Sequence, residues 1–116
     1  MVIGASSNRA KFGNRAVRAY RRQSHDVFPV NPRADVIEGL KCYRSISDVP
    51  GPIDRALFYV PSAIGLNAVE ELAQRSDVSE IWFNPGSESP QLIAKARKLG
   101  FEPILDCSII DIGERP

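Results

Sequence analysis

The sequence is poor in the residues that build metal sites and disulfide scaffolds. Among 116 residues it has two cysteines, Cys42 and Cys107, and one histidine, His25. There is no Cys-x-x-Cys pair to start a zinc site, and two cysteines are too few for a disulfide-stapled domain. A chain of this length buries a substantial core without either device. We therefore expect one domain over residues 1–116 and no bound metal.

Long apolar runs and an excess of one charge are also missing. No segment approaches the roughly 20 apolar residues that span a bilayer, and the chain does not open with a signal-peptide pattern. A net charge of +1 gives the chain as a whole no electrostatic footprint for nucleic acid or an anionic membrane. We therefore expect a cytoplasmic protein that binds neither. Four arginines share one expected helix, where a solvated helix face is the favoured interpretation: Arg15, Arg18, Arg21 and Arg22.

Short strand-like apolar runs alternate with amphipathic helical segments along the chain. Serine hydroxyls accept hydrogen bonds from free helix N–H groups, so Ser62 and Ser89 are expected to cap two helices, and Gly100 is expected to end the second. This alternation, with mostly short connections, predicts a mainly parallel sheet of five strands with helices on both faces. The expected strands are Met1–Gly4, Asp26–Val30, Arg55–Val60, Glu80–Phe83 and Glu102–Asp106.

Small, polar or proline-containing segments follow four of these strands. In an open parallel sheet, ligands bind beyond the carboxyl ends of the strands, where the strand order reverses. A turn of small residues before a helix lets a phosphate approach backbone N–H groups closely. Glycine and proline end many strands without any ligand, so the succession of four such segments is what indicates a binding edge. The segments are Gly4–Ser7, Val30–Pro32, Tyr59–Ser62 and Asn84–Gly86.

A nicotinamide dinucleotide is the first ligand to consider at such an edge. Its fingerprint is Gly-x-Gly-x-x-Gly after the first strand and an acidic residue at the end of the second. Here Gly4 is followed by Ala5 and Ser6, and the next glycine is Gly13. The second expected strand ends without a carboxylate. Both departures disfavour an NAD(P)-binding oxidoreductase-like domain. Such a domain, or a subunit of a larger enzyme, remains the alternative interpretation.

Taken in order, the segments resemble the small coenzyme A-binding proteins, which are built like the CoA-binding domain of acyl-CoA and succinyl-CoA synthetases. The resemblance covers nearly the whole chain, and the ordered set carries it rather than any single motif. It implies a Rossmann-like three-layer α/β sandwich that binds CoA or an acyl-CoA. The matching segments are Val2–Ser6, Lys11–Gly13, Val27–Pro32, Ile37–Tyr43, Ser45–Pro50, Ile53 with Asp54, Val60 with Pro61, Trp82 with Gly86, and Asp106 with Cys107.

The resemblance also implies where CoA binds. The first turn would hold the pyrophosphate, the end of the second strand would line the adenosine, and the end of the third would form the opposite wall. Arg9, Lys11 and Arg33 are candidates for the ribose 3′-phosphate, although each is equally well explained as a solvated surface residue. The implied site residues are Gly4, Ala5, Ser6, Ser7, Arg9, Lys11, Gly13, Asn31, Pro32, Arg33, Tyr43, Val60, Pro61, Ser62 and Gly86.

Several other side chains have two interpretations each. Tyr43 either covers the site or anchors its own loop, whereas Trp82 lies within an expected strand, which favours core packing. Cys107 matches a cysteine of the family, and a buried reduced thiol is favoured over a reactive one. His25 is expected on the surface at the edge opposite the ligand. Since no nucleophile with a base is recognisable, we expect CoA binding without catalysis, and a protein partner is left open.

Overall fold

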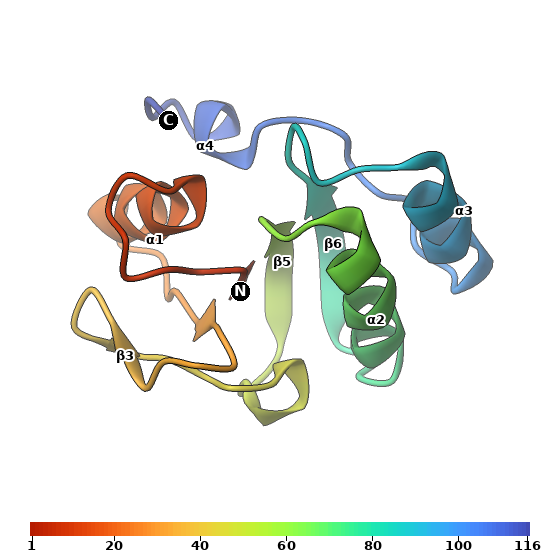
Figure 1. Ribbon diagram of the computed structural model, residues 1–116, viewed down its shortest axis with the longest axis horizontal. Coiled ribbons are helices and arrows are strands. Elements are labelled where there is room, and N and C mark those ends of the chain that lie inside the picture. Colours follow the sequence, from red (N-terminus) through yellow and green to blue (C-terminus); the bar gives the residue numbers. More distant parts are fainter.

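A parallel sheet of four strands forms the centre of the computed structural model, which describes residues 1–116 (Figure 1). The strand order is β2-β1-β5-β6. The α-helices flank this sheet, which confirms the predicted Rossmann-like α/β fold. The elements in chain order are β1 (Val2–Ile3), α1 (Phe12–Arg22), β2 (Pro29–Val30), β3 (Val36–Ile37), β4 (Leu40–Lys41), the 3-10 helix η1 (Ile46–Asp48), β5 (Ile53–Phe58), α2 (Ser62–Ala73), β6 (Val78–Phe83), α3 (Pro90–Lys98) and α4 (Ser108–Asp111).

The core is divided in two because successive side chains of a strand point to opposite faces of the sheet. In β5, Ala56 and Phe58 pack with residues of α2 and α3, whereas Leu57 packs on the other face with residues of α1 and α4. Trp82 of β6 belongs to this second cluster and is buried, as predicted. Two apolar clusters separated by the sheet make the three layers that the sequence predicts.

The predicted fifth strand, Glu102–Asp106, is wrong in extent. Only Ile104 pairs with the sheet, through one isolated parallel bridge to Trp82. After Ile104 the chain leaves the sheet, because the Asp106 carboxylate accepts the N–H of Cys107 at 2.8 Å where α4 begins. Aspartate often competes with a strand ladder through such local hydrogen bonds.

The first two strands are also shorter than predicted, since β1 and β2 pair over two residues each. The long irregular stretch after β2 contains the antiparallel hairpin β3–β4 and the 3-10 helix η1. It is therefore partly structured rather than an open loop. The hairpin tip, Glu38, reaches back to α1 and contributes to the site described below.

The helix ends follow the predicted chemistry at two positions and depart from it at one. Ser89 caps α3 by accepting the N–H of Leu92 at 3.1 Å, and Gly100 follows this helix with φ +95°. The prediction that Ser62 caps α2 is wrong: Pro61 occupies that position, and the Ser62 hydroxyl shares a hydrogen bond with Ser89. No helix is long and apolar enough to cross a membrane.

Candidate functional site

The carboxyl ends of the four strands lie level with one another. Ile3 of β1 pairs with Val30 on one side and Phe58 on the other, and Phe58 pairs with Phe83. The four segments singled out in the sequence therefore start from one edge of the sheet. Strand order reverses between β1 and β5, because β2 lies on one side of β1 and β5 on the other. Ligands of open parallel sheets bind at such a reversal.

Two glycines allow the turn after β1 to pack closely against its neighbours. Gly4 has φ +89°, and a β-carbon at this position would lie 2.5 Å from the carbonyl oxygen of Tyr59. Gly13, the second residue of α1, packs against the Gly4 carbonyl so closely that a β-carbon would overlap it. Both positions therefore require glycine, and together they hold the turn, the helix and the end of β5 against one another.

The turn between β1 and α1 presents backbone N–H groups that have no acceptor within the protein. These belong to Ser6, Ser7 and Arg9 in the turn and to Phe12 and Gly13 at the start of α1. The Ser6 hydroxyl accepts the N–H of Asn8 at 3.0 Å, which shapes the turn. An anion at this turn would meet free donors together with the positive end of the helix dipole.

Asn31 connects the end of β2 to this turn. Its amide nitrogen donates to the carbonyl oxygen of Ala5 at 2.8 Å, and its amide oxygen accepts the N–H of Arg33 at 2.8 Å. Both ends of the amide are therefore engaged in shaping the local backbone. Asn31 lies where the resemblance places it, but its side chain holds the edge in position, and the exposed Pro32 follows it.

Asn14 connects the turn to the β3–β4 hairpin and was not singled out from the sequence. It is completely buried. Its amide nitrogen donates to the Ser6 carbonyl oxygen at 2.8 Å and to Glu38 Oε2 at 3.1 Å, and its oxygen accepts from Arg18 Nε at 2.8 Å. The signal available in the sequence was the helical spacing between Asn14 and Val17, which places this polar residue on the apolar face of α1.

Three cationic candidates surround the turn. Arg9 is exposed, and its Nε lies 3.5 Å from Glu38 Oε2. Lys11 occupies the N-cap position of α1 and is exposed, as is Arg33 beyond the end of β2. An ion pair as exposed as that of Arg9 contributes little stability, so these side chains are free to meet an anionic ligand.

The opposite wall of the edge comes from the ends of β5 and β6. Val60 lies directly across from Gly4, and Pro61 is exposed at the start of α2. Ser62 is oriented toward Ser89 rather than the turn by their shared hydrogen bond. Gly86, with φ +92°, donates its N–H to the Glu88 carboxylate at 3.0 Å.

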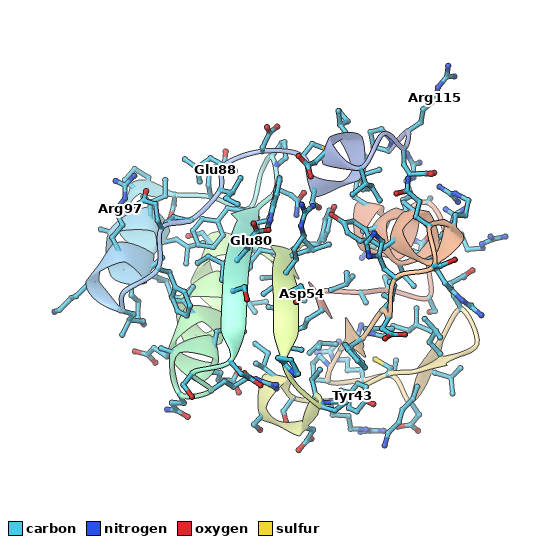
Figure 2. All side chains as sticks on the ribbon, turned by 180° about the vertical axis from the view of Figure 1, so that it is seen from behind. Tyr43, Asp54, Glu80, Glu88, Arg97 and Arg115 are labelled. Carbon is cyan, nitrogen blue, oxygen red and sulfur yellow. The ribbon has the colours of Figure 1, made fainter.

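Two further candidates lie differently from the main group. The ring of Tyr43 packs edge-on against Phe28 with 6.1 Å between centroids, and Figure 2 shows Tyr43 beside η1, toward the end of the molecule away from Glu88. These contacts favour the loop-anchoring interpretation. Cys107, expected to be buried, is a partly exposed free thiol before α4.

A buried polar network lies beyond this edge and attaches α4 to the sheet. The Asn84 amide donates to the Phe58 carbonyl oxygen at 3.0 Å and accepts both the N–H and the hydroxyl of Ser108 at 2.9 Å. The hydroxyls of Ser108 and Tyr59 share a bond of 3.0 Å, and Tyr20 donates to the Ser108 carbonyl oxygen at 2.8 Å. Asn84 thus has a structural role at the end of β6.

Alkaline pH should destabilise the fold through Tyr59. Burial raises the pKa of the Tyr59 hydroxyl above its usual range. The folded protein therefore keeps the phenol protonated at a pH where the unfolded chain, with a pKa of about 10, releases the proton. Its contribution to stability is complete below that pH and is lost as the pH rises further. The melting temperature of the wild type should therefore fall more steeply from about pH 9 to 11 than that of Tyr59→Phe. Parallel curves would contradict this role.

A separate cavity lies elsewhere, at the amino ends of the strands. It has a volume of about 670 Å³, and its lining includes His25, Phe28 and Asp54. His25 is exposed at this opposite edge, as predicted. None of the site residues expected from the sequence lines this cavity. The carboxyl edge is the stronger candidate because it combines the reversal of strand order with free N–H donors.

Comparison with known proteins identifies relatives of similar length and much longer CoA ligases and synthetases. Residues 1–112 match the family model described as a CoA binding domain. A conserved hypothetical protein from Pyrococcus furiosus has a solved structure that is 38% identical, with a TM-score of 0.86 and coverage of 94% of each chain. Acetate–CoA ligase (ADP-forming) I of Archaeoglobus fulgidus is 38% identical over 85 residues, a match that covers 73% of this chain and 12% of the ligase.

A solved structure of a ligase-type relative shows the same fold. The dinucleotide-forming acetyl-coenzyme A synthetase 1 of Ca. Korarchaeum cryptofilum, in complex with phosphate and ADP, is 30% identical with a TM-score of 0.77. That match covers 90% of this chain and 25% of the synthetase. The chain therefore spans only a small part of the length of these ligases and synthetases.

Proposed function

Because the chain belongs to the CoA-binding domain family, we propose that it binds CoA or an acyl-CoA at the carboxyl edge of its sheet. The observation that supports this most directly is the turn between β1 and α1. Its five backbone N–H groups without acceptors lie before or within the first turn of an 11-residue helix, at the positive end of the helix dipole. The pyrophosphate is the part of CoA whose charge and acceptor oxygens match these donors.

The roles of the surrounding residues follow from their positions. The turn residues hold the pyrophosphate, and Gly13 lets α1 begin directly behind them. The adenosine lies between the residues after β2 and those after β5, where the exposed prolines offer apolar surface. Cations at the rim receive the 3′-phosphate through charge-assisted hydrogen bonds. The turn residues that hold the pyrophosphate are Gly4–Ser7. The adenosine contacts Pro32, Val60 and Pro61. The cations that receive the 3′-phosphate are Arg9, Lys11 and Arg33.

The end of β2 favours CoA over a nicotinamide dinucleotide. In NAD-binding sheets an acidic residue at this place binds the ribose hydroxyls. Here the position is held by Asn31, whose amide is engaged with Ala5 and Arg33. We further propose that the chain binds its ligand without performing chemistry on it, as a carrier or sensor. The nearest carboxylate beyond β6, Glu88, is engaged with the N–H of Gly86.

Thermal unfolding with a panel of nucleotides tests this proposal. A ligand at 100 times its dissociation constant should raise the free energy of unfolding by about 2.7 kcal/mol. We expect this shift with CoA and acetyl-CoA, and a smaller one with dephospho-CoA at the same concentration, because dephospho-CoA lacks the 3′-phosphate. NAD and NADP are the matched controls. A clear shift with NAD and none with CoA would reverse the assignment in favour of the dinucleotide.

A further inference from the structure

Positive charge is concentrated on one side of a protein that is nearly neutral overall. Residues 9–22 contain six of the 15 basic residues and no acidic residue. The remainder of the chain therefore carries nine basic residues and all 14 acidic ones. The net charge of +1 therefore results from a strongly basic segment, made of the turn and α1, and an acidic remainder that nearly cancel.

Four of the six basic side chains of this segment converge rather than spread over the surface. They line a depression of about 270 Å³ that has no hydrophobic residue in its wall. The lining comes from the turn, from the outer face of α1 and from the end of the chain, and Figure 2 shows Arg115 on the same side of the molecule as α1. The lining residues are Arg9, Arg15, Arg18, Arg22, Arg115 and Pro116; we call this depression the arginine pocket.

The carboxylates of the protein balance only part of this charge. Arg9 and Arg22 each have one carboxylate within ion-pair distance, at 3.5 and 2.8 Å, whereas Arg15 and Arg115 have none. Arg15, Arg18 and Arg22 are three and four residues apart, so they share one helix face, where like charges destabilise one another. An anion bound between them would relieve this repulsion.

From this geometry we propose that the arginine pocket binds a short chain of phosphate groups next to the CoA site, with which it shares only Arg9. A guanidinium group donates two parallel hydrogen bonds to a phosphate, which makes arginine the preferred residue for such anions. Arginines make up the wall apart from Pro116, so it offers little apolar surface for a base, and the phosphate chain itself is the recognised group. Such a chain is either free inorganic polyphosphate or part of a nucleotide.

Titration calorimetry with inorganic tripolyphosphate tests the pocket. Binding should occur to the free protein and persist in protein saturated with CoA, because the other four arginines of the pocket lie outside the proposed CoA site. The variant Arg15→Gln/Arg115→Gln removes two cations that have no ion pair, and we expect it to weaken binding by about tenfold or more. Arg97→Gln/Lys98→Gln removes the same charge from the last turn of α3 and should leave the affinity within about twofold, because neither residue lines the pocket.

The other arms separate the possible outcomes. If tripolyphosphate and ATP bind with equal affinity, the phosphate chain alone is sufficient for binding. If ATP binds more tightly, the natural ligand is a nucleotide. No binding to the wild type would overturn the proposal, as would an equal loss in the α3 variant. Displacement of tripolyphosphate by CoA would also overturn it, because the pocket would then be part of the CoA site. The titration of the free protein tests phosphate binding independently of whether the protein binds CoA.

Discussion

Replacing Gly4 with alanine should destabilise the protein and abolish CoA binding together. The residue has φ +89°, and the added β-carbon would lie 2.5 Å from the Tyr59 carbonyl oxygen and 2.7 Å from Val60 Cγ1. The left-handed conformation alone costs an alanine about 1–2 kcal/mol, and forcing β1 and β5 apart adds about 1–3 kcal/mol. Urea unfolding measures the loss of stability, and titration with CoA measures the loss of binding.

Gly100→Ala is the matched control for this substitution. Gly100 has nearly the same backbone conformation, with φ +95°, but nothing lies within 4 Å of its missing β-carbon. It should therefore lose only the conformational part of the stability and keep its affinity for CoA. Equal losses of stability in the two variants would show that the close approach of β5 to Gly4 carries no cost, which would contradict the role assigned to Gly4.

The features that the sequence predicts correctly are those set by local physics. Helical and strand periodicity predicts the alternating elements and the two faces of the sheet. Turn chemistry predicts the sharp turn after β1, where Gly4 has the positive φ that glycine adopts most readily. Ser89 and Gly100 fulfil their predicted helix-end roles because both act within one turn of their own position.

Most of the features that it misses involve partners distant along the chain, and one involves a local hydrogen bond that competes with the sheet. The fifth strand is reduced to Ile104 by the way Asp106 turns the chain toward α4. Ser62 is not the cap of α2 because Pro61 takes the N-cap position, and its hydroxyl instead bonds that of Ser89, 27 residues away. Asn14 looks like an ordinary polar helix residue until the hairpin brings Glu38 against it. No local sequence pattern predicts a contact between residues 24 positions apart.

Asn14→Asp should separate the shape of the turn from the docking of the hairpin. The aspartate has nearly the same size and still accepts from Arg18, but it has no N–H for the Ser6 carbonyl or for Glu38. Leaving a buried acceptor without its partner costs about 1–3 kcal/mol, and a second carboxylate facing Glu38 adds repulsion. We expect a loss of about 2–4 kcal/mol in the free energy of unfolding, measured by urea titration. CoA binding should weaken by about tenfold, the equivalent of one charge-assisted hydrogen bond.

Adding Glu38→Gln to this variant distinguishes the two contacts of Asn14. The amide that this second substitution introduces can donate to the new aspartate, so it removes the repulsion and restores part of the stability. It does not reach the Ser6 carbonyl, whose partner in the wild type is the Asn14 amide at 2.8 Å. The double variant should therefore recover stability while its affinity for CoA stays low. Recovery of both would show that Asn14 supports binding through the hairpin, because the geometry of the phosphate turn would then not depend on the Ser6 contact.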